Sequence, residues 1–213
     1  MCSTKMNESS NSDKTSLKQL NIAENRATKK YTYQELVVRV LWSFGRVVFR
    51  LTPRPMFGVR RWVLRRFGAR VGKNVHIYPS VIIYFPWNLV IGDDSAIGEH
   101  ALIYNLGMVS IGQRATVSQR AHLCGGSHDI HDPAMPLLKP PIQIQDDSWV
   151  CADAFVGPGT IVGRGAVVGA RAVVTKDVDE WTVVAGNPAI QIKNRSFNHG
   201  ETKGGSVERQ VVD

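Results

Sequence analysis

Aliphatic residues recur at every sixth position along most of the chain from Val71 onward. Four residues after nearly all of them stands a small residue, such as Ser95, Ala101 or Ala166, and glycine often follows the aliphatic residue directly. An α-helix repeats its faces about every 3.6 residues and a strand every two, so neither element explains this period. The aliphatic positions are Ile91, Ile97, Ile103, Ile111, Val117, Leu123, Ile144, Val150, Val156, Val162, Val168 and Val174.

A coil with three flat sides does repeat at six, because each hexad supplies one short strand and one turn, and three hexads complete one rung. In such a coil the aliphatic residue points inward, the small residue lies near the corner, and glycine permits the turn backbone. We expect rungs to begin near Val71, Ile91, Ile111, Ile144 and Val162. A sandwich of ordinary alternating strands, the competing architecture, predicts no fixed period of six.

The coil is expected over residues 71–193, with one large interruption. The expected rung starts at Ile111 and Ile144 are much further apart than the other starts, so residues 129–143 must leave the coil as a loop. Irregular loops that rise from a rigid scaffold are frequent places for binding and catalysis. This loop is therefore the first place to look for chemistry.

The segments outside the repeat differ from it in composition and in the spacing of their apolar residues. Residues 1–30 are polar and are expected to form a flexible leader, and residues 194–213 a flexible tail. Residues 31–70 predict a basic helical cap for the open end of the coil. Its first helix, over Tyr33–Leu51, has apolar residues at three- and four-residue spacings, and a second short helix follows over Phe57–Gly68.

Composition agrees with one domain that has a substantial core and a small appendage. The chain has 213 residues, of which 43% are hydrophobic and 21% charged. The chain has three cysteines, Cys2, Cys124 and Cys151, and this odd, scattered number argues against a disulfide framework. Their spacing also lacks the paired pattern of a metal site. We therefore predict a protein of the reducing cytoplasm.

The net charge of +8 is unevenly distributed. Residues 26–75 hold 13 lysines and arginines against one acid, Glu35, so the rest of the chain is net negative. Such a basic arm fits either solvent-exposed arginines on a cap or contact with an anionic surface at the inner face of a membrane. Nucleic acid is not expected as a partner, because no nucleic-acid-binding motif accompanies the charge. The apolar run Leu36–Leu51 is too short and too often broken by arginine to span a bilayer.

Several stretches of the sequence indicate which family of repeat proteins the coil resembles. With the hexads, they resemble the hexapeptide-repeat acetyltransferases, in particular the colanic-acid-biosynthesis type related to maltose and galactoside O-acetyltransferases, over about Gly68 to Lys193. The stretches are Tyr84-Phe85-Pro86-Trp87-Asn88-Leu89, Gly126-Ser127-His128-Asp129, Ala154-Phe155-Val156-Gly157-Pro158-Gly159, Val174-Thr175-Lys176-Asp177-Val178 and Trp181-Thr182-Val183-Val184-Ala185-Gly186-Asn187-Pro188-Ala189.

This resemblance implies an all-β fold, a left-handed parallel β-helix with a short α-helical N-terminal cap. It also implies a homotrimer that transfers acetyl from acetyl-CoA to a hydroxyl of a sugar or glycan precursor, with no metal. A non-catalytic scaffold or sugar-binding module that kept the coil is the alternative. A zinc lyase of the carbonic anhydrase kind is less favoured, because His122 and His128 are six residues apart and should lie on successive faces.

His128 is the expected catalytic residue. It ends the hexad that begins at Leu123, where the regular coil gives way to the loop. Removing a proton from an attacking hydroxyl suits an imidazole, which titrates near neutrality, and in the resembling family a histidine at this point is the general base. The competing interpretation is a loop histidine that caps a turn. Asp129, Asp132 or a backbone carbonyl could orient the ring.

The resemblance also assigns residues to the two substrates. Acetyl-CoA would lie along the later rungs between subunits, against Ala152, Ala170, Thr175, Lys176 and Lys193, where flat alanine corners accept the pantetheine arm and the lysines meet phosphates. The family's arginine after its Asn-Pro-Ala stretch is Ile190 here, and another of its arginines is Lys193.

Tyr104 and Asn105 precede His128 by about one rung and are candidates to face the acceptor. Asn105 is equally compatible with an internal ladder at a corner of the coil. Cys124 and Cys151 occupy the small-residue slot after a core aliphatic residue, so they are expected to pack and not to act as nucleophiles.

Overall fold

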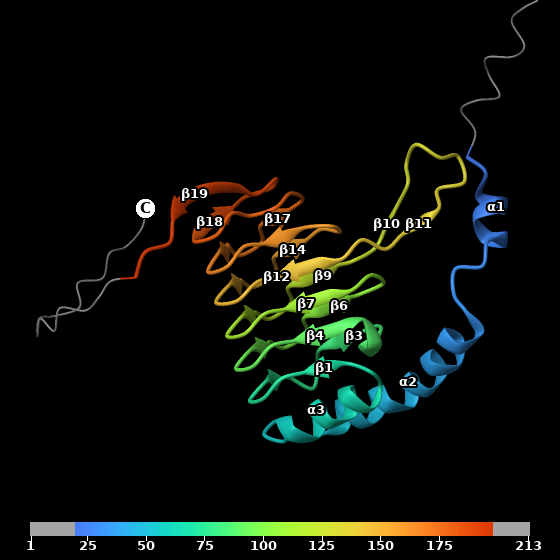
Figure 1. Ribbon diagram of the computed structural model, residues 1–213, viewed down its shortest axis with the longest axis horizontal. Helices are drawn as coiled ribbons and strands as arrows, with labels where there is room; N and C mark the ends of the chain where they lie inside the picture. The colour runs from blue at the N-terminus through green and yellow to red at the C-terminus, as the bar shows by residue number, and fades with distance from the viewer. Residues whose placement is uncertain (1–19, 198–213) are drawn as a thin grey trace, which may run out of the picture.

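The computed structural model describes residues 20–197, and most of them wind into one coil of short parallel strands with two helices across its first rung (Figure 1). The strands fall on three faces, and successive strands along the chain move from face to face. This arrangement is the expected left-handed parallel β-helix. The first face consists of β1 (Arg70–Val71), β4 (Leu89–Ile91), β7 (Val109–Ile111), β12 (Ile142–Ile144) and β15 (Ile161–Val162).

The other two faces complete each rung. The second face ends in an antiparallel strand, β19, which pairs with β18 and closes the sheet. Its strands are β2 (His76–Ile77), β5 (Ala96–Ile97), β8 (Thr116–Val117), β13 (Trp149–Val150), β16 (Val167–Val168), β18 (Thr182–Ala185) and β19 (Ile190–Asn194). The third face consists of β3 (Ile82–Ile83), β6 (Leu102–Tyr104), β9 (His122–Cys124), β14 (Phe155–Val156) and β17 (Val173–Val174).

The register confirms the expected rung starts. Val71 pairs with Ile91, Ile91 with Ile111, Ile111 with Ile144, and Ile144 with Val162. The inward aliphatic side chains of the coil are at most 2% exposed from Ile91 to Val174, so they form one continuous core along its axis. Because each rung covers only its neighbours, this column of aliphatic side chains holds the coil together.

The glycines after the aliphatic residues have a different role from the one expected. The glycines that directly follow the inward aliphatic residues do not have a positive φ. At the corners that conformation is adopted by residues such as Asp94 and Arg114, with φ of 58° and 54°, and by Gly165, with φ of 66°. A Cβ atom on Gly92 would lie 2.6 Å from the backbone nitrogen of Gln113 in the next rung. Glycine is therefore needed here because the next rung stacks too closely for any side chain, and the turn itself does not demand it.

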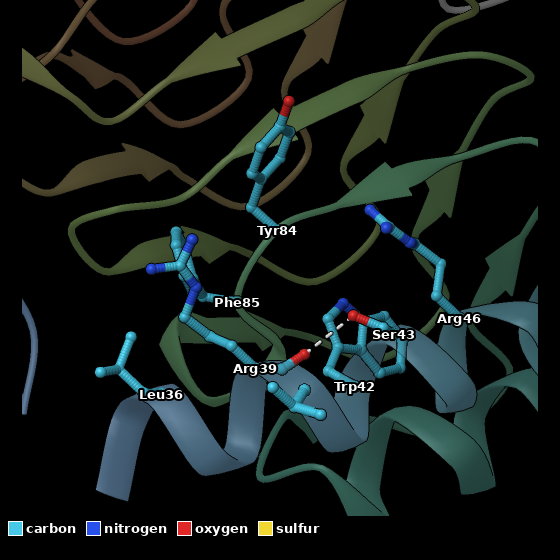
Figure 2. Close-up of a pocket in the computed structure, with 8 residues that line it drawn as sticks. Leu36, Arg39, Trp42, Ser43, Arg46, Tyr84 and Phe85 are labelled. Atoms are coloured by element: carbon cyan, nitrogen blue, oxygen red, sulfur yellow. Dashed lines mark hydrogen bonds between the residues drawn. The ribbon is translucent and has the colours of Figure 1, made fainter. Parts of the chain in front are cut away.

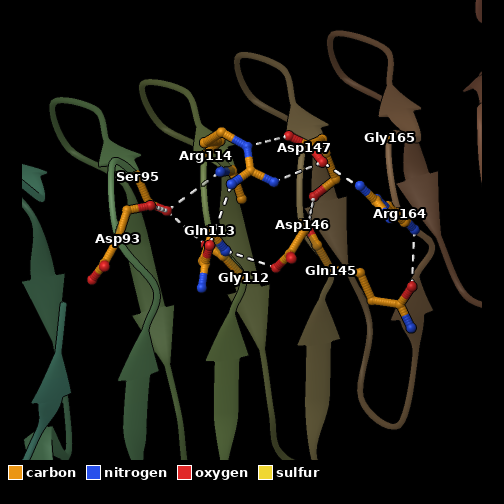
Figure 3. A network of polar contacts seen from close by, with 12 residues as sticks. Asp93, Ser95, Gly112, Gln113, Arg114, Gln145, Asp146, Asp147, Arg164 and Gly165 are labelled. Atoms are coloured by element: carbon orange, nitrogen blue, oxygen red, sulfur yellow. Dashed lines mark hydrogen bonds and ion pairs between the residues drawn. The ribbon is translucent and has the colours of Figure 1, made fainter. Parts of the chain in front are cut away.

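Polar side chains line the corner between the first and second faces (Figure 3). Arg114 reaches Asp147 of the next rung at 2.6 Å, and Arg164 approaches the same carboxylate at 3.4 Å. The guanidinium of Arg114 lowers the pKa of Asp147. Because the side chains of Arg114 and Arg164 are about half exposed, these ion pairs add little stability.

Two helices, α2 (Tyr33–Leu51) and α3 (Phe57–Arg66), lie against the first rung of the coil. Trp42 and Phe49 of α2 are buried against the coil, and the Trp42 indole donates to the carbonyl of Ile83 at 2.9 Å. The capping box of Thr32 and Glu35 satisfies the first amides of α2.

The side chain of Arg60 joins the end of α2 to the coil. It is fully buried, and its Nε donates to the carbonyl of Ile77 at 2.6 Å. Its terminal nitrogens donate to the carbonyls of Thr52, Pro53 and Arg54, at 3.1, 2.9 and 2.6 Å. Burial lowers the pKa of Arg60, yet the guanidinium stays charged and serves backbone groups that would otherwise lack a donor.

Replacing this arginine tests how much the cap depends on it. We expect Arg60→Met to lower the midpoint of thermal unfolding by roughly 6–12 °C, because several buried carbonyls lose their donor. Arg70→Met, at an exposed position of β1, is the matched control and should unfold within about 2 °C of the unchanged protein. Equal midpoints for both variants would contradict the assigned role.

Candidate functional site

The candidate active site is the loop that interrupts the third rung. After β9 the chain forms a hairpin of β10 (Ser127–His128) and β11 (Leu137–Leu138), which stands away from the coil before β12 begins (Figure 1). His128 pairs with Leu137 at the base of this hairpin, and its side chain is exposed. The rigid rung therefore sets the position of the imidazole, while the loop surrounds it.

The imidazole of His128 is oriented by the backbone. Its Nδ1 lies 2.6 Å from the carbonyl oxygen of Met135. A carbonyl oxygen can only accept, so Nδ1 carries the hydrogen and the lone pair of the neutral ring is on Nε2. Nε2 is thus the atom able to take a proton from a bound hydroxyl.

The two loop carboxylates do not perform this orientation. One carboxylate oxygen of Asp129 accepts from the backbone nitrogen of His131 at 2.9 Å, and one of Asp132 accepts from that of Ala134 at 2.8 Å. Both aspartates therefore build turns within the loop. Of the three orienting groups that the sequence left open, the structure selects the backbone carbonyl.

The N-terminal arm holds this carbonyl in place. Asn25 of α1 (Ile22–Ala27) donates to the carbonyls of Ala134 and Met135 at 2.6 and 2.5 Å. The backbone nitrogen of Asn21 also donates to the carbonyl of Pro133 at 2.8 Å. Met135 itself has a positive φ of 46°, an uncommon conformation for a residue other than glycine.

The N-terminal arm differs from what the sequence predicted, and its residue Asn25 contributes to the site although the sequence pattern did not indicate it. The expected flexible leader, residues 1–30, is folded over Ile22–Ala27, and residues 1–19 lie outside the described part of the chain. Asn21 caps α1 by accepting from the backbone nitrogen of Glu24, which is a helix-start pattern visible in the sequence. Nothing in the pattern places Asn25 at the loop, because that contact spans 110 residues.

Tyr104 lies beside the base of the hairpin. It pairs with Cys124 of the next rung, and a Cβ atom on Gly126 would lie 3.1 Å from its ring. Burial raises the pKa of Tyr104, so its phenol stays protonated and can donate a hydrogen bond.

Asn105, the second expected acceptor residue, is fully buried. Its amide donates to the carbonyl of Phe85 at 2.6 Å and accepts from the backbone nitrogen of Phe85 at 3.0 Å. It is therefore a rung of an internal ladder, and the expectation that it faces the acceptor is corrected.

The five residues expected to contact acetyl-CoA lie on the last rungs but not in one corner. Ala152 and Ala170 follow β13 and β16, at the corner between the second and third faces. Thr175 and Lys176 follow β17, at the other edge of the third face, which is also where the hairpin of His128 leaves the coil. Lys193 lies on the edge strand β19, opposite Val183.

Two further histidines of the coil pack against aromatic rings. His76 stacks on Phe57 with ring centroids 4.4 Å apart, and the ring of His122 meets that of Phe155 edge-on at 5.2 Å. Within residues 20–197 no three histidine, cysteine or acidic residues gather as metal ligands would. Burial raises the pKa of Cys151, which disfavours its thiolate.

The chain is 40% identical over 158 residues to the Escherichia coli K12 protein named "Putative colanic acid biosynthesis acetyltransferase WcaF", a match that covers 74% of this chain and 87% of that protein. No protein-family model matches the chain.

Solved structures share the fold. Galactoside acetyltransferase in complex with coenzyme A superposes with a TM-score of 0.74 at 23% identity, covering 90% of this chain and 100% of that one. A hexapeptide-repeat acetyltransferase of Vibrio cholerae O1, complexed with acetyl coenzyme A, superposes with a TM-score of 0.72 at 20% identity, covering 79% and 93%. With the relative from Escherichia coli, these findings confirm that the chain belongs to the hexapeptide-repeat acetyltransferase family.

Proposed function

We propose that the protein transfers acetyl from acetyl-CoA to a hydroxyl group of a sugar or glycan precursor, with His128 as the general base. One observation carries the assignment of the base: the carbonyl of Met135 holds Nδ1 at 2.6 Å and leaves Nε2 free at an exposed site. Family membership supports the acetyl group, and the names of its relatives support coenzyme A and a sugar.

The reaction needs one group that takes and returns a proton. Nε2 of His128 removes the hydroxyl proton while the oxygen attacks the thioester carbon, and a tetrahedral intermediate forms. Collapse of that intermediate breaks the carbon–sulfur bond, and the proton passes from the imidazolium to the departing thiolate of CoA. The Met135 carbonyl stabilises the imidazolium through the Nδ1 hydrogen, and backbone amides are the proposed donors for the oxyanion.

The split of the acetyl-CoA residues over two corners supports a homotrimer. Ala152 and Ala170 lie at one edge of the third face, and Thr175 and Lys176 at the other. In a three-fold assembly of parallel coils, one edge of a subunit faces the other edge of its neighbour. A groove between subunits would then bring both sets to the same coenzyme.

The acceptor would enter from the side of the hairpin. Tyr104 is half-buried below the loop and keeps its hydroxyl hydrogen, so it can donate to a sugar oxygen. Exposed loop residues, together with a neighbouring subunit, would select the sugar.

Removing the imidazole tests the general base. We expect His128→Ala to lower kcat for acetyl transfer about 10²- to 10⁴-fold, measured as release of free CoA with a panel of sugar acceptors. The matched control is His131→Ala, an exposed histidine of the same loop, for which we expect kcat to stay close to that of the unchanged protein. A rate for His128→Ala within about threefold of the unchanged protein would refute the assignment, and no CoA release by the unchanged protein would favour the scaffold alternative.

Lys176 tests the coenzyme groove. We expect Lys176→Ala to raise KM for acetyl-CoA about threefold to tenfold with little change in kcat, because a phosphate loses one charged donor. Lys73→Ala, at an exposed turn near the other end of the coil, should leave KM unchanged. An equal rise in KM for acetyl-CoA in both variants would show that coenzyme binding depends only on the net charge of the protein and not on Lys176.

Asn25 tests the positioning of the base. We expect Asn25→Ala to lower kcat about threefold to tenfold while KM for both substrates stays the same, because the Met135 carbonyl loses one of its anchors. The control is Gln34→Ala, an exposed position on α2. A rise in KM without a loss of kcat would show that Asn25 shapes the acceptor site instead of holding His128.

A further inference from the structure

The helix α2 is apolar on the side that faces away from the protein. Its buried residues, Trp42, Gly45 and Phe49, lie on one side. The opposite side carries a continuous stripe within about 140° of the helix circumference at 100° per residue. This outer face consists of Tyr33, Leu36, Val37, Val40, Leu41, Phe44, Val47, Val48 and Leu51, all between 42% and 81% exposed.

An apolar outer side is unusual, because the outer side of a surface helix is normally polar. Phe44 and Val40 are 71% and 61% exposed, which leaves much of each side chain in water. Trp62 of α3, 61% exposed, borders the same hollow as Phe44 and Val48 and extends the face. Contiguous apolar patches of this kind mark contact with a partner or a membrane.

Positive charge borders the outer face. Arg39, Arg46 and Arg50 follow one flank of α2, and Arg66 of α3 lies near the other flank. The only acidic residue of α2, Glu35, is bound within the capping box at the N-terminal end of the helix. The surface that covers this face is therefore expected to be anionic.

Two arginines, Arg39 and Arg46, line a groove beside α2 and stand on either side of Trp42 and Ser43 (Figure 2). The groove has a volume of about 490 Å³ and lies between α2 and the chain that follows β3. Arg39 and Arg46 line it with Tyr84, while Leu36 and Val40 belong both to the groove and to the outer face. A molecule with an anionic head and an apolar chain fits both features at once.

Arg39 is held in position for such a head group. Its guanidinium lies 4.2 Å from the centre of the Tyr31 ring and 5.3 Å from that of Phe85. Stacking on two rings fixes the planar donor and leaves its edges free for phosphate oxygens.

We propose that the outer face of α2 docks on an anionic phospholipid bilayer. The helix lies in the headgroup layer, Phe44 and Trp62 enter the acyl region, and Arg39 and Arg46 bind lipid phosphates in the groove. No helix within residues 20–197 has the length and apolar character to cross a bilayer, so the contact is peripheral.

Charge argues against the other occupants. A second copy placed face to face would bring the same arginines together and repel, whereas anionic lipid complements them. Residues 1–19 contain only Cys2, three methionine or leucine residues and otherwise polar residues, too few to cover the stripe. The inference is independent of acetyl transfer and would stand if that proposal failed.

Sedimentation with vesicles tests the inference on the full chain. We expect binding to phosphatidylcholine vesicles that contain about one third phosphatidylglycerol to be at least about tenfold tighter than to pure phosphatidylcholine, and to weaken with salt. Val40→Glu with Phe44→Glu should abolish this binding, because both side chains are exposed and their replacement leaves the core intact. Ile192→Glu, an equally exposed apolar position on β19, is the matched control and should bind like the unchanged protein.

A second variant separates the head-group site from the apolar contact. Arg39→Gln with Arg46→Gln should lower the affinity for anionic vesicles about tenfold while binding to pure phosphatidylcholine stays the same. Light scattering on all variants monitors the oligomeric state. The inference is overturned if the unchanged protein does not bind anionic vesicles, if Val40→Glu with Phe44→Glu binds equally well, or if those substitutions dissociate the oligomer without any vesicle binding by the unchanged protein.

Discussion

The stacking of identical rungs is the constraint on which the rest of the structure depends. Each strand donates its backbone amides to the rung beside it, so the inward aliphatic positions must repeat in the same register from Val71 to Val174. This requirement also explains the glycines, because Gly92 touches the backbone of the next rung. A coil built in this way is rigid along its length and offers flat faces and corners, which suit the binding of an extended ligand.

Catalysis needs an irregular element, and the hairpin that carries His128 supplies it without disturbing the coil. The rungs before and after it pair directly, Ile111 with Ile144. The imidazole is oriented by the Met135 carbonyl, so the only ionisable group in the contact is the base itself. The N-terminal arm then ties the loop to the cap through Asn25, and Lys139 lies 4.8 Å from the ring of Tyr31. Cap, arm and active site are thus one connected unit.

The helix α2 of the cap has two apolar sides in different surroundings. The inner side of α2 packs Trp42 and Phe49 against the first rung, which a solenoid requires at its open end. The outer side, around Phe44, is as apolar as the inner side, yet no part of the described chain covers it. The basic charge of this segment therefore does not follow from capping alone. If α2 lies on a membrane, the hairpin of His128 stands further along the coil, away from that surface (Figure 1).

The sequence by itself determined the coil, its rung starts and the point at which the loop leaves it, because a repeat of six is a local pattern that every rung obeys. It also indicated His128, through its place at the end of the last hexad before the loop and through the resemblance to a family. Only the tertiary structure decided that Asn105 faces the interior, that Asn25 reaches the loop, and that a carbonyl replaces Asp129 and Asp132 as the orienting group. Those contacts join segments far apart in the chain or depend on the path of an irregular loop, and no local period encodes them.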